Sequence, residues 1–361
     1  MYKLKRPTNR QLADFYDAYG PRIQYLMQEL ASGNITIQTK LGSKYYVFLT
    51  QKVQANSETW KFLVKYSQEA NLRKLLCGDW NCHFNIIKEV CQSFPGRSWQ
   101  EKMEKGKYKA GKYATYGQDA DGNEIVEDFN EIIYWLFVTQ MFEGKDDVSP
   151  FIKKDFVIER GLEVCPYCGL KPIDVAEVNG SISKPYIDHF MPKRKYPFLA
   201  MSYMNLIPAC QFCNEDENKG DYDPLLYPNY EMRLVNPYEF YDKVVTFGYE
   251  YNYQGENDEK NFKVLSEAEN DNLEDGYLIK LKLRKFYSHR SWEVKDLYRR
   301  FTKSTNSFKK FLYRLGINKN YLYDLEETTL GHSPNEDYAH REPGYKFHKD
   351  LLAQLKREYG I

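Results

Sequence analysis

The sequence lacks a hydrophobic run long enough for a membrane helix. Its longest purely apolar stretch near the middle, Ile132 to Val138, has seven residues, whereas a membrane-spanning helix needs about 20. The opening residues MYKLKRPTNRQL are basic, but no apolar stretch or small-residue cleavage site follows them, so the pattern of a secretory signal is also missing. These absences exclude a membrane partner and predict a chain in the reducing cytoplasm.

The sequence also lacks net charge, because 51 Lys and Arg balance 51 Asp and Glu. This balance argues against a protein coated with positive charge on every side, but it leaves room for local patches. Residues 242–275 carry ten acids and three bases, while residues 276–320 carry thirteen bases against Glu293 and Asp296. Charge is therefore segregated along the chain.

Internal repeats and long low-complexity tracts are missing too, so the chain is divided by changes in character. Residues 1–148 are predicted to form a mostly helical N-terminal domain. The turn-forming run from Asp146 to Pro150 marks the start of a second domain of short elements, residues 149–241. Residues 242–361 are predicted to form an acidic strand-and-turn region followed by basic helices. The expected fold class is α+β and mainly helical.

Four local patterns support this description of the first domain. Apolar residues from Gln11 to Leu30 recur with helical period, and Gly20-Pro21 predicts a break into two helices. Alternating residues on either side of Gly42-Ser43 predict a β-hairpin. The polar, glycine-bearing stretch from Lys102 to Asn123 predicts a loop. It is followed by a strongly apolar helix from Glu127 to Phe142.

Cysteine is scarce, and the seven cysteines do not indicate a disulfide framework in a chain without an export signal. Cys77, Cys82 and Cys91 lie in a stretch whose apolar residues have roughly helical spacing. They are therefore interpreted as small core residues rather than as a second metal site with His83. The other four form two pairs, each with a two-residue gap: Cys165, Cys168, Cys210 and Cys213. That gap lets both thiolates of a pair reach one ion, which predicts a structural Zn²⁺.

The segment between the two cysteine pairs carries the candidate chemistry. Forty-one residues separate Cys168 from Cys210, which is longer than the usual gap between zinc-binding pairs. The insertion contains Asp188-His189 and Asn205, and Asn214 directly follows the second pair. A zinc ion that joins both ends would hold these four side chains near one another without a large separate core.

The order of these motifs along the chain carries a resemblance. The segment from Val164 to Gly220 resembles an HNH endonuclease of the ββα-metal type with a four-cysteine zinc site. The features shared with that family are two CxxC pairs, an acid-His pair at the end of a strand, an Asn in the hairpin and an Asn just after the second pair. The resemblance covers fifty-seven of 361 residues. It implies a central zinc-stabilised ββα-metal module, and the flanking regions resemble no family.

The resemblance implies a role for each catalytic side chain. His189 would be the general base that takes a proton from the attacking water, a task that suits a neutral imidazole. Asn205 would bond the far ring nitrogen and fix the orientation of the ring.

Asp188 and Asn214 would hold one divalent cation, Mg²⁺ or Mn²⁺, since such hard ions prefer oxygen ligands. Asn218, four residues further on, is expected on the same helical face and could add a ligand or a phosphate contact. Lys219 is left outside this set because its offset turns it away from that face.

The basic segment from 276 to 320 is the expected phosphate-binding platform. A small nuclease module buries little surface and needs further phosphate contacts. Lys193, Arg194 and Lys195 would lie beside the scissile phosphate. The expected contacts in the platform are Arg284, Lys285, Arg290, Arg299, Arg300, Lys309 and Lys310. The alternative is an amphipathic helical pair whose aromatic face is core and whose basic face is merely solvated.

The sequence thus predicts a metal-dependent phosphodiesterase that acts on DNA, with RNA left open as a substrate. The resemblance implies 5′-phosphate and 3′-hydroxyl products, and a place in bacterial antiviral defence or restriction, beside an ATPase partner. The competing interpretation is a zinc adaptor that binds nucleic acid or protein without cutting.

Overall fold

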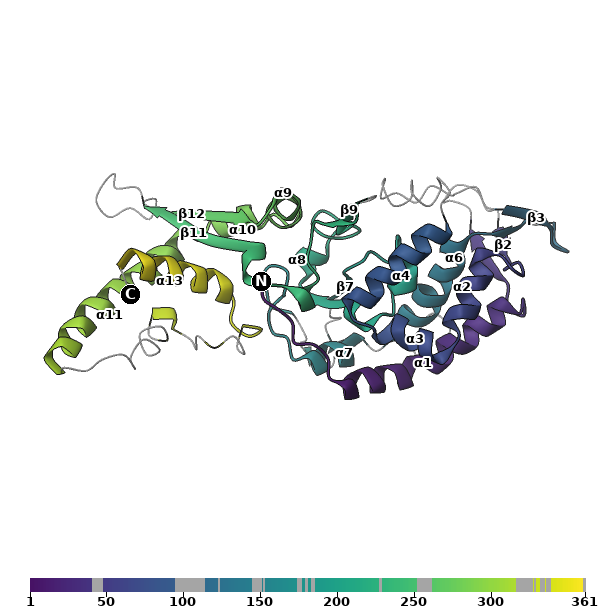
Figure 1. Ribbon diagram of the computed structural model, residues 1–361, viewed down its shortest axis with the longest axis horizontal. Coiled ribbons are helices and arrows are strands. Elements are labelled where there is room, and N and C mark those ends of the chain that lie inside the picture. Colours follow the sequence, from purple (N-terminus) through teal and green to yellow (C-terminus); the bar gives the residue numbers. More distant parts are fainter. Residues whose placement is uncertain are drawn as a thin grey trace.

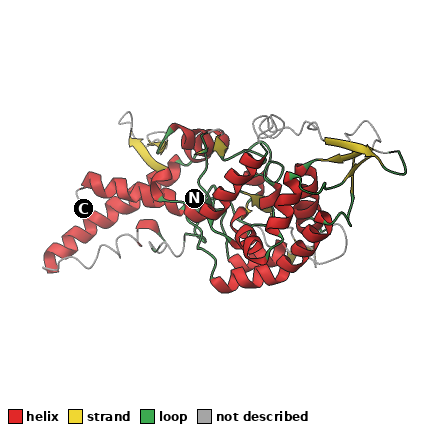
Figure 2. Cartoon of the chain, turned by 45° about the vertical axis from the view of Figure 1, so that its right-hand side comes forward, coloured by secondary structure: helices red, strands yellow, loops and turns green. Residues whose placement is uncertain are grey.

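A computed structural model describes the chain over residues 1–40, 48–94, 114–122, 124–144, 151, 153–173, 177–178, 181–182, 186–226, 229–251, 262–315, 327, 329–331, 335 and 339–359. The protein is a mixed α+β, mainly helical molecule, as predicted, and helices dominate the view in Figure 2. Within the described ranges, no helix combines the length and apolar character that crossing a membrane requires.

The molecule is elongated, with its parts in chain order along the long axis (Figure 1). The N-terminal helices lie at one end: α1 (Asn9–Ala31), α2 (Glu58–Tyr66), α3 (Glu69–Cys77), α4 (Trp80–Ser93), α6 (Phe129–Tyr134) and the π-helix η1 (Trp135–Phe142). The predicted break at Gly20-Pro21 is wrong, because α1 continues through both residues. Buried Ile23, Leu26 and Met27 follow Pro21, and their packing outweighs its missing hydrogen bond.

A small sheet lies beyond these helices, with strand order β1-β2-β4-β3. Its strands are β1 (Ile37–Lys40), β2 (Phe48–Gln51), β3 (Ala114–Gln118) and β4 (Glu124–Glu127). β1 and β2 pair antiparallel, which confirms the predicted hairpin, although the Gly42-Ser43 turn lies outside the described residues. The predicted Lys102–Asn123 loop is wrong at its end, since residues 114–118 form β3 against β4.

The middle of the molecule consists of short elements. They are α7 (Lys153–Arg160), β5 (Glu177–Val178), β6 (Ser181–Ile182), β7 (Tyr186–His189), η2 (Pro197–Leu199), η3 (Tyr203–Asn205), β8 (Leu206–Ala209), α8 (Gln211–Asn214), β9 (Leu225–Leu226) and β10 (Glu231–Met232). β7 and β8 pair antiparallel, with His189 opposite Leu206. The candidate catalytic pair, Asp188 and His189, forms the end of strand β7 in this hairpin.

The far end joins a β-ribbon to helices. Its elements are η4 (Pro237–Glu239), η5 (Asp242–Val244), β11 (Val245–Tyr251), β12 (Phe262–Ala268), α9 (Asp271–Leu273), the π-helix η7 (Glu274–Lys280), α10 (Leu283–Ser288), α11 (Ser291–Leu315) and α13 (Tyr345–Tyr359). β11 and β12 pair antiparallel over seven residues each. Strands followed by helices is the order that the sequence predicted for this region.

One hydrophobic core runs through all three parts. Phe15 of α1 meets the ring of Tyr203 at a centroid distance of 5.2 Å, and Trp80 of α4 meets Phe190 at 5.3 Å. The Ser202 hydroxyl donates to the Leu75 carbonyl at 2.6 Å. The helical end therefore packs directly on the loop between β7 and β8, and the boundaries after residues 148 and 241 stay predictions.

Candidate functional site

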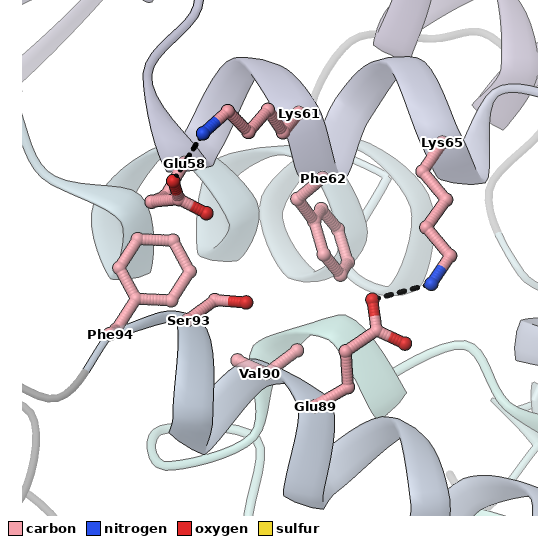
Figure 3. Close-up of a pocket in the computed structure, with 8 residues that line it drawn as sticks. All are labelled: Glu58, Lys61, Phe62, Lys65, Glu89, Val90, Ser93 and Phe94. Atoms are coloured by element: carbon pink, nitrogen blue, oxygen red, sulfur yellow. Dashed lines mark hydrogen bonds and ion pairs between the residues drawn. The ribbon is translucent and has the colours of Figure 1, made fainter.

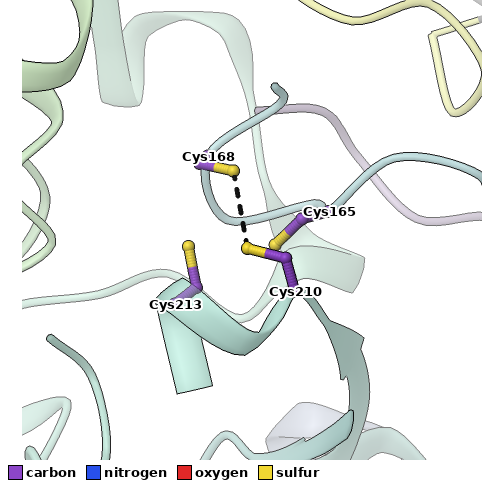
Figure 4. Close-up of side chains that lie close together, drawn as sticks. All are labelled: Cys165, Cys168, Cys210 and Cys213. Atoms are coloured by element: carbon purple, nitrogen blue, oxygen red, sulfur yellow. Dashed lines mark hydrogen bonds between the residues drawn. The ribbon is translucent and has the colours of Figure 1, made fainter. Parts of the chain in front are cut away.

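The four cysteines of the two CxxC pairs come together in one buried cluster (Figure 4). Cys165 and Cys168 lie on a turn closed by the Val164–Pro172 bridge, and Cys210 and Cys213 lie at the start and within α8. All four Sγ atoms are within 4.8 Å of one another. Four thiolates around a zinc ion, with Zn–S bonds of about 2.3 Å, stand about 3.8 Å apart, so the cluster fits the metal.

The surroundings of the first pair favour the thiolate at one cysteine, because the pKa of Cys168 is lowered whereas burial raises the pKa of Cys165. The Gly169 amide donates to the Cys165 carbonyl at 2.7 Å, with Gly169 in the left-handed region that glycine adopts readily. The Lys171 amide donates to the Cys168 Sγ at 3.5 Å. Hydrogen bonds from Cys165 and the other thiols, together with this amide, lower the pKa of Cys168. The deprotonated thiolate is the form of cysteine that binds a metal ion.

His189 lies at the end of β7 with one ring nitrogen held in place. Its Nε2 is 3.1 Å from the Ala200 carbonyl oxygen, and a carbonyl can only accept, so Nε2 carries the proton. The lone pair is then on Nδ1, which no described residue hydrogen-bonds. Burial, with the nearby Lys193 charge, lowers the pKa of His189 well below its usual value. The imidazole is thus neutral near pH 7 and has one nitrogen available as a base.

Asn205 does not hold the histidine ring, so that expectation is wrong. Its Oδ1 accepts from the Met191 amide at 2.7 Å, and its Nδ2 donates to the carbonyls of Met191 and Leu199 at 3.2 and 2.9 Å. The side chain therefore closes the loop between β7 and β8. Since Ala200 is in this loop, Asn205 fixes the carbonyl that orients His189 and acts on the ring through the backbone.

Asp188 is almost fully buried and is paired with Lys219. The Lys219 Nζ lies 2.9 Å from Oδ2 of Asp188 and also donates to the His189 carbonyl at 2.8 Å. The Tyr167 hydroxyl donates to the same carboxylate at 2.6 Å. Burial raises the pKa of Asp188, and the Lys219 charge opposes that rise. Both partners of the ion pair are shielded from solvent, with Lys219 completely buried.

Lys219 is the site residue that sequence reasoning missed. Lys219 was left out because the helix was expected to continue past residue 214 and to turn this side chain away. That expectation is wrong, since α8 ends at Asn214 and the backbone of Glu215 is extended. For the same reason Asn218 is not on one helical face with Asn214. Its Nδ2 donates to the Phe212 carbonyl at 2.6 Å, and its buried Oδ1 has no hydrogen-bond partner within the described ranges. Asn214 itself is half-buried.

One residue from outside the predicted module, Phe142, contacts His189. The ring of Phe142, the last residue of η1, meets the His189 ring edge-on at 4.5 Å. The ammonium groups of Lys153, in α7, and Lys193 lie 4.3 and 5.4 Å from the centre of the Phe142 ring. Phe142 ends the apolar helix that the sequence predicts. The helical period of that segment does not reveal that its last residue contacts a histidine.

The basic residues after β7 are all ion-paired. Lys193 pairs with Glu143 at 3.1 Å and Arg194 with Asp221 at 3.0 Å. The Lys195 ammonium is buried 3.5 Å from Asp223. These three cations are adjacent in sequence to the Asp-His pair, but Lys195 has a structural partner and is not exposed to a substrate.

The predicted platform divides into paired and unpaired cations. Arg284 pairs with Glu274 at 2.8 Å, Arg300 with Asp296 at 3.0 Å, and Arg290 with Glu293. Lys285 and Arg299 are exposed, and neither has an ion-pair partner among the described residues. The side chains of Lys309 and Lys310 lie outside the described part of α11.

A pocket of about 220 Å³ lies between α2 and α4 (Figure 3). Apolar Phe62, Val90 and Phe94 line it together with charged side chains. Its two lysines are already neutralised, since Lys61 pairs with Glu58 and Lys65 with Glu89, both at 2.6 Å. The pocket shares no lining residue with the cysteine cluster or with the Asp188-His189 pair.

Comparison with known proteins gives one short similarity. No family model matches the chain, and no solved structure matches it. Protein ea31 of Escherichia phage lambda is 35% identical to it over 63 residues, which is 18% of this chain and 18% of the phage protein. The chain therefore spans less than a fifth of that relative, and the similarity does not establish a family.

Proposed function

We propose that this protein is a metal-dependent endonuclease of the HNH type that hydrolyses phosphodiester bonds in DNA. The observation that carries the proposal is the state of His189: Nε2 is held by the Ala200 carbonyl at 3.1 Å, and Nδ1 has no partner among the described residues. A neutral imidazole oriented in this way is arranged to take a proton from water. The zinc-binding cysteines at both ends of the insertion provide the rigid support such a base needs.

The neighbouring residues have supporting roles in this proposal. Lys219 ties Asp188 to the His189 backbone, and Asn205 fixes the loop that carries Ala200. The ammonium groups of Lys153 and Lys193 lie beside the Phe142 ring, which contacts His189. Lys193 pairs with Glu143 and would have to exchange that carboxylate for an anionic phosphodiester.

Oxygen donors for a catalytic Mg²⁺ or Mn²⁺ are Asp188, Asn214 and Asn218, and such an ion would neutralise charge on the scissile phosphate. Among the described residues, the buried Oδ1 of Asn218 has no hydrogen-bond partner, so this oxygen is available to a ligand. Asp188 already accepts hydrogen bonds from Lys219 and Tyr167. A divalent ion at this carboxylate would therefore have to replace the Lys219 ammonium there.

The test is cleavage of supercoiled plasmid DNA with and without Mg²⁺ or Mn²⁺. His189→Ala is expected to lower the rate by about 100-fold or more, because it removes the base, while zinc content and DNA affinity stay unchanged. His289→Ala, which alters an exposed histidine after α10, should cut at the parent rate. Undiminished cleavage by His189→Ala contradicts the mechanism.

A second candidate is a zinc adaptor that binds nucleic acid or a partner protein without cutting. The Asp188–Lys219 ion pair favours it, because it occupies the carboxylate expected to bind metal. DNA binding without metal-dependent cleavage in the same assay would support the adaptor. A role in bacterial defence beside an ATPase rests on the family resemblance and belongs to the nuclease proposal.

A further inference from the structure

Helix α11 has two opposite faces. Val294, Leu297 and Phe301 are buried against the rest of the C-terminal region. Arg299 and Lys303 follow Trp292 by seven and eleven residues. At 3.6 residues per turn, both lie within about 20° of Trp292 around the helix axis, so the three residues form one stripe. That stripe lies opposite the buried face, and the three side chains point away from the core.

The large side chain of Trp292 is mostly exposed to solvent. Its exposed fraction is 56%, whereas Phe301 on the same helix and Tyr287 just before it are fully buried. No other ring or cation among the described residues contacts the indole. An exposed indole offers a flat aromatic face on which another ring can stack.

The cations beside Trp292 are available for a ligand. Lys295, Arg299 and Lys303 have no ion-pair partner among the residues that the structure describes, and Arg299 and Lys303 are exposed. Arg300, on the flank of the helix, pairs with Asp296 at 3.0 Å. Among the described residues, no acid pairs with Lys295, Arg299 or Lys303, and their positive charge complements an anionic partner.

We propose that this face, Trp292, Lys295, Arg299 and Lys303, binds a single nucleic-acid strand by stacking an unpaired base on Trp292. Arg299 and Lys303 lie about 10 and 16 Å along the helix from Trp292 and contact successive backbone phosphates. An unpaired base is required, because the bases of a duplex are already stacked on their neighbours. The inference rests on the proposed nuclease function and assigns single-stranded DNA or RNA as its preferred substrate.

The first experiment measures binding of a labelled thymidine oligonucleotide of about 20 nucleotides and of a blunt duplex of equal length, without added divalent metal. Trp292→Ala is expected to weaken single-strand binding by about 5- to 100-fold, in line with the loss of one base stack, and to change duplex binding much less. The matched control is Tyr25→Ala, which removes a comparably exposed aromatic ring from α1. It should bind like the parent.

The second experiment measures salt dependence of single-strand binding. Arg299→Gln with Lys303→Gln should lower the slope of log affinity against log salt by about 1.4, because each lost phosphate contact releases about 0.7 fewer counterions. Lys74→Gln, an exposed lysine on α3, should leave the slope unchanged.

The inference is overturned if Trp292→Ala binds the single strand with the affinity of the parent. It is also overturned if the substitution weakens binding of the single strand and of the duplex by the same factor. Selective binding that needs Trp292 supports it even if the protein does not cleave, so failure of the nuclease proposal remains distinguishable. If neither nucleic acid binds, the inference is wrong.

Discussion

The Lys219 ammonium lies 2.9 Å from a carboxylate oxygen of Asp188 and 2.8 Å from the His189 carbonyl, so one cation binds both residues of the Asp-His pair. Asp188 is 4% exposed and Lys219 is completely buried. Removal of one partner of such a pair leaves an uncompensated charge in a medium that solvates it poorly, which costs about 3–5 kcal/mol.

The first prediction concerns this pair. Lys219→Met should lower the free energy of unfolding by about 3–5 kcal/mol, and millimolar Mg²⁺ or Mn²⁺ should restore part of the loss, because the cation can then reach Asp188. Urea unfolding with and without the metal measures both effects.

The control is a second ion pair of low exposure that shares no residue with the Asp188 pair. Lys346 is 3% exposed, and its ammonium lies 2.9 Å from Asp350. Lys346→Met should also destabilise the protein, but divalent metal should not rescue it. Equal metal rescue of both variants, or of neither, would show that Asp188 is not a metal ligand.

At the scale of elements, the cysteine cluster joins the turn at residues 165–168 to α8 and thereby closes the insertion that carries His189. α8 has only four residues, too few for a stable helix by itself. A metal ion held by the four cysteines would stabilise the start of this helix.

The second prediction follows from the cluster. Metal analysis should return about one tightly bound zinc per chain, and Cys213→Ser should lose that zinc together with the structure of the module. Cys82→Ser, at a half-buried thiol in α4, should retain it. A folded, zinc-free Cys213→Ser protein would refute the structural role.

The elements that could be predicted from the sequence are those set by local pattern. The two-residue spacing of each cysteine pair is a local constraint, and it led to the cluster that the structure contains. The hairpin of β1 and β2 and the buried stripe of α11 follow from alternation and helical period.

The predictions that failed depended on tertiary contacts. Packing carries α1 through Pro21, and the early end of α8 lets Lys219 turn back to Asp188. Asn205 bonds the backbone of its own loop, which no spacing reveals. Arg284 pairs with Glu274, which lies outside residues 276–320, so counting charges within that segment overestimated its free positive charge.

At the scale of the whole molecule, acid stability depends on histidines that are buried in neutral form. Burial lowers the pKa of His83 to about 4, and it lowers the pKa of His189 in the same direction. As the pH falls below about 6.5 the unfolded chain takes up a proton at each of these positions, while the folded chain does not. Each histidine therefore makes folding less favourable in acid.

The third prediction is that the free energy of unfolding falls between pH 6.5 and about 4 by up to about 1.4 kcal/mol per pH unit for His83 alone. Urea titrations at about pH 7, 6 and 5 measure the slope. His83→Met should reduce it, whereas His289→Gln, at an exposed position, should not. A slope unaffected by His83→Met contradicts the assignment.

The contact between Phe142 and His189, with ring centres 4.5 Å apart, also bears on how such a protein can change during evolution. Phe142 ends a helix of the N-terminal part, and Trp80 of the same part packs on Phe190, the residue after His189. Recombination that joined residues 149–241 to an unrelated neighbour would separate His189 from both rings. We therefore expect the segment that carries His189 and its helical partner to be inherited together, with substitutions at their contact compensated on the opposite side.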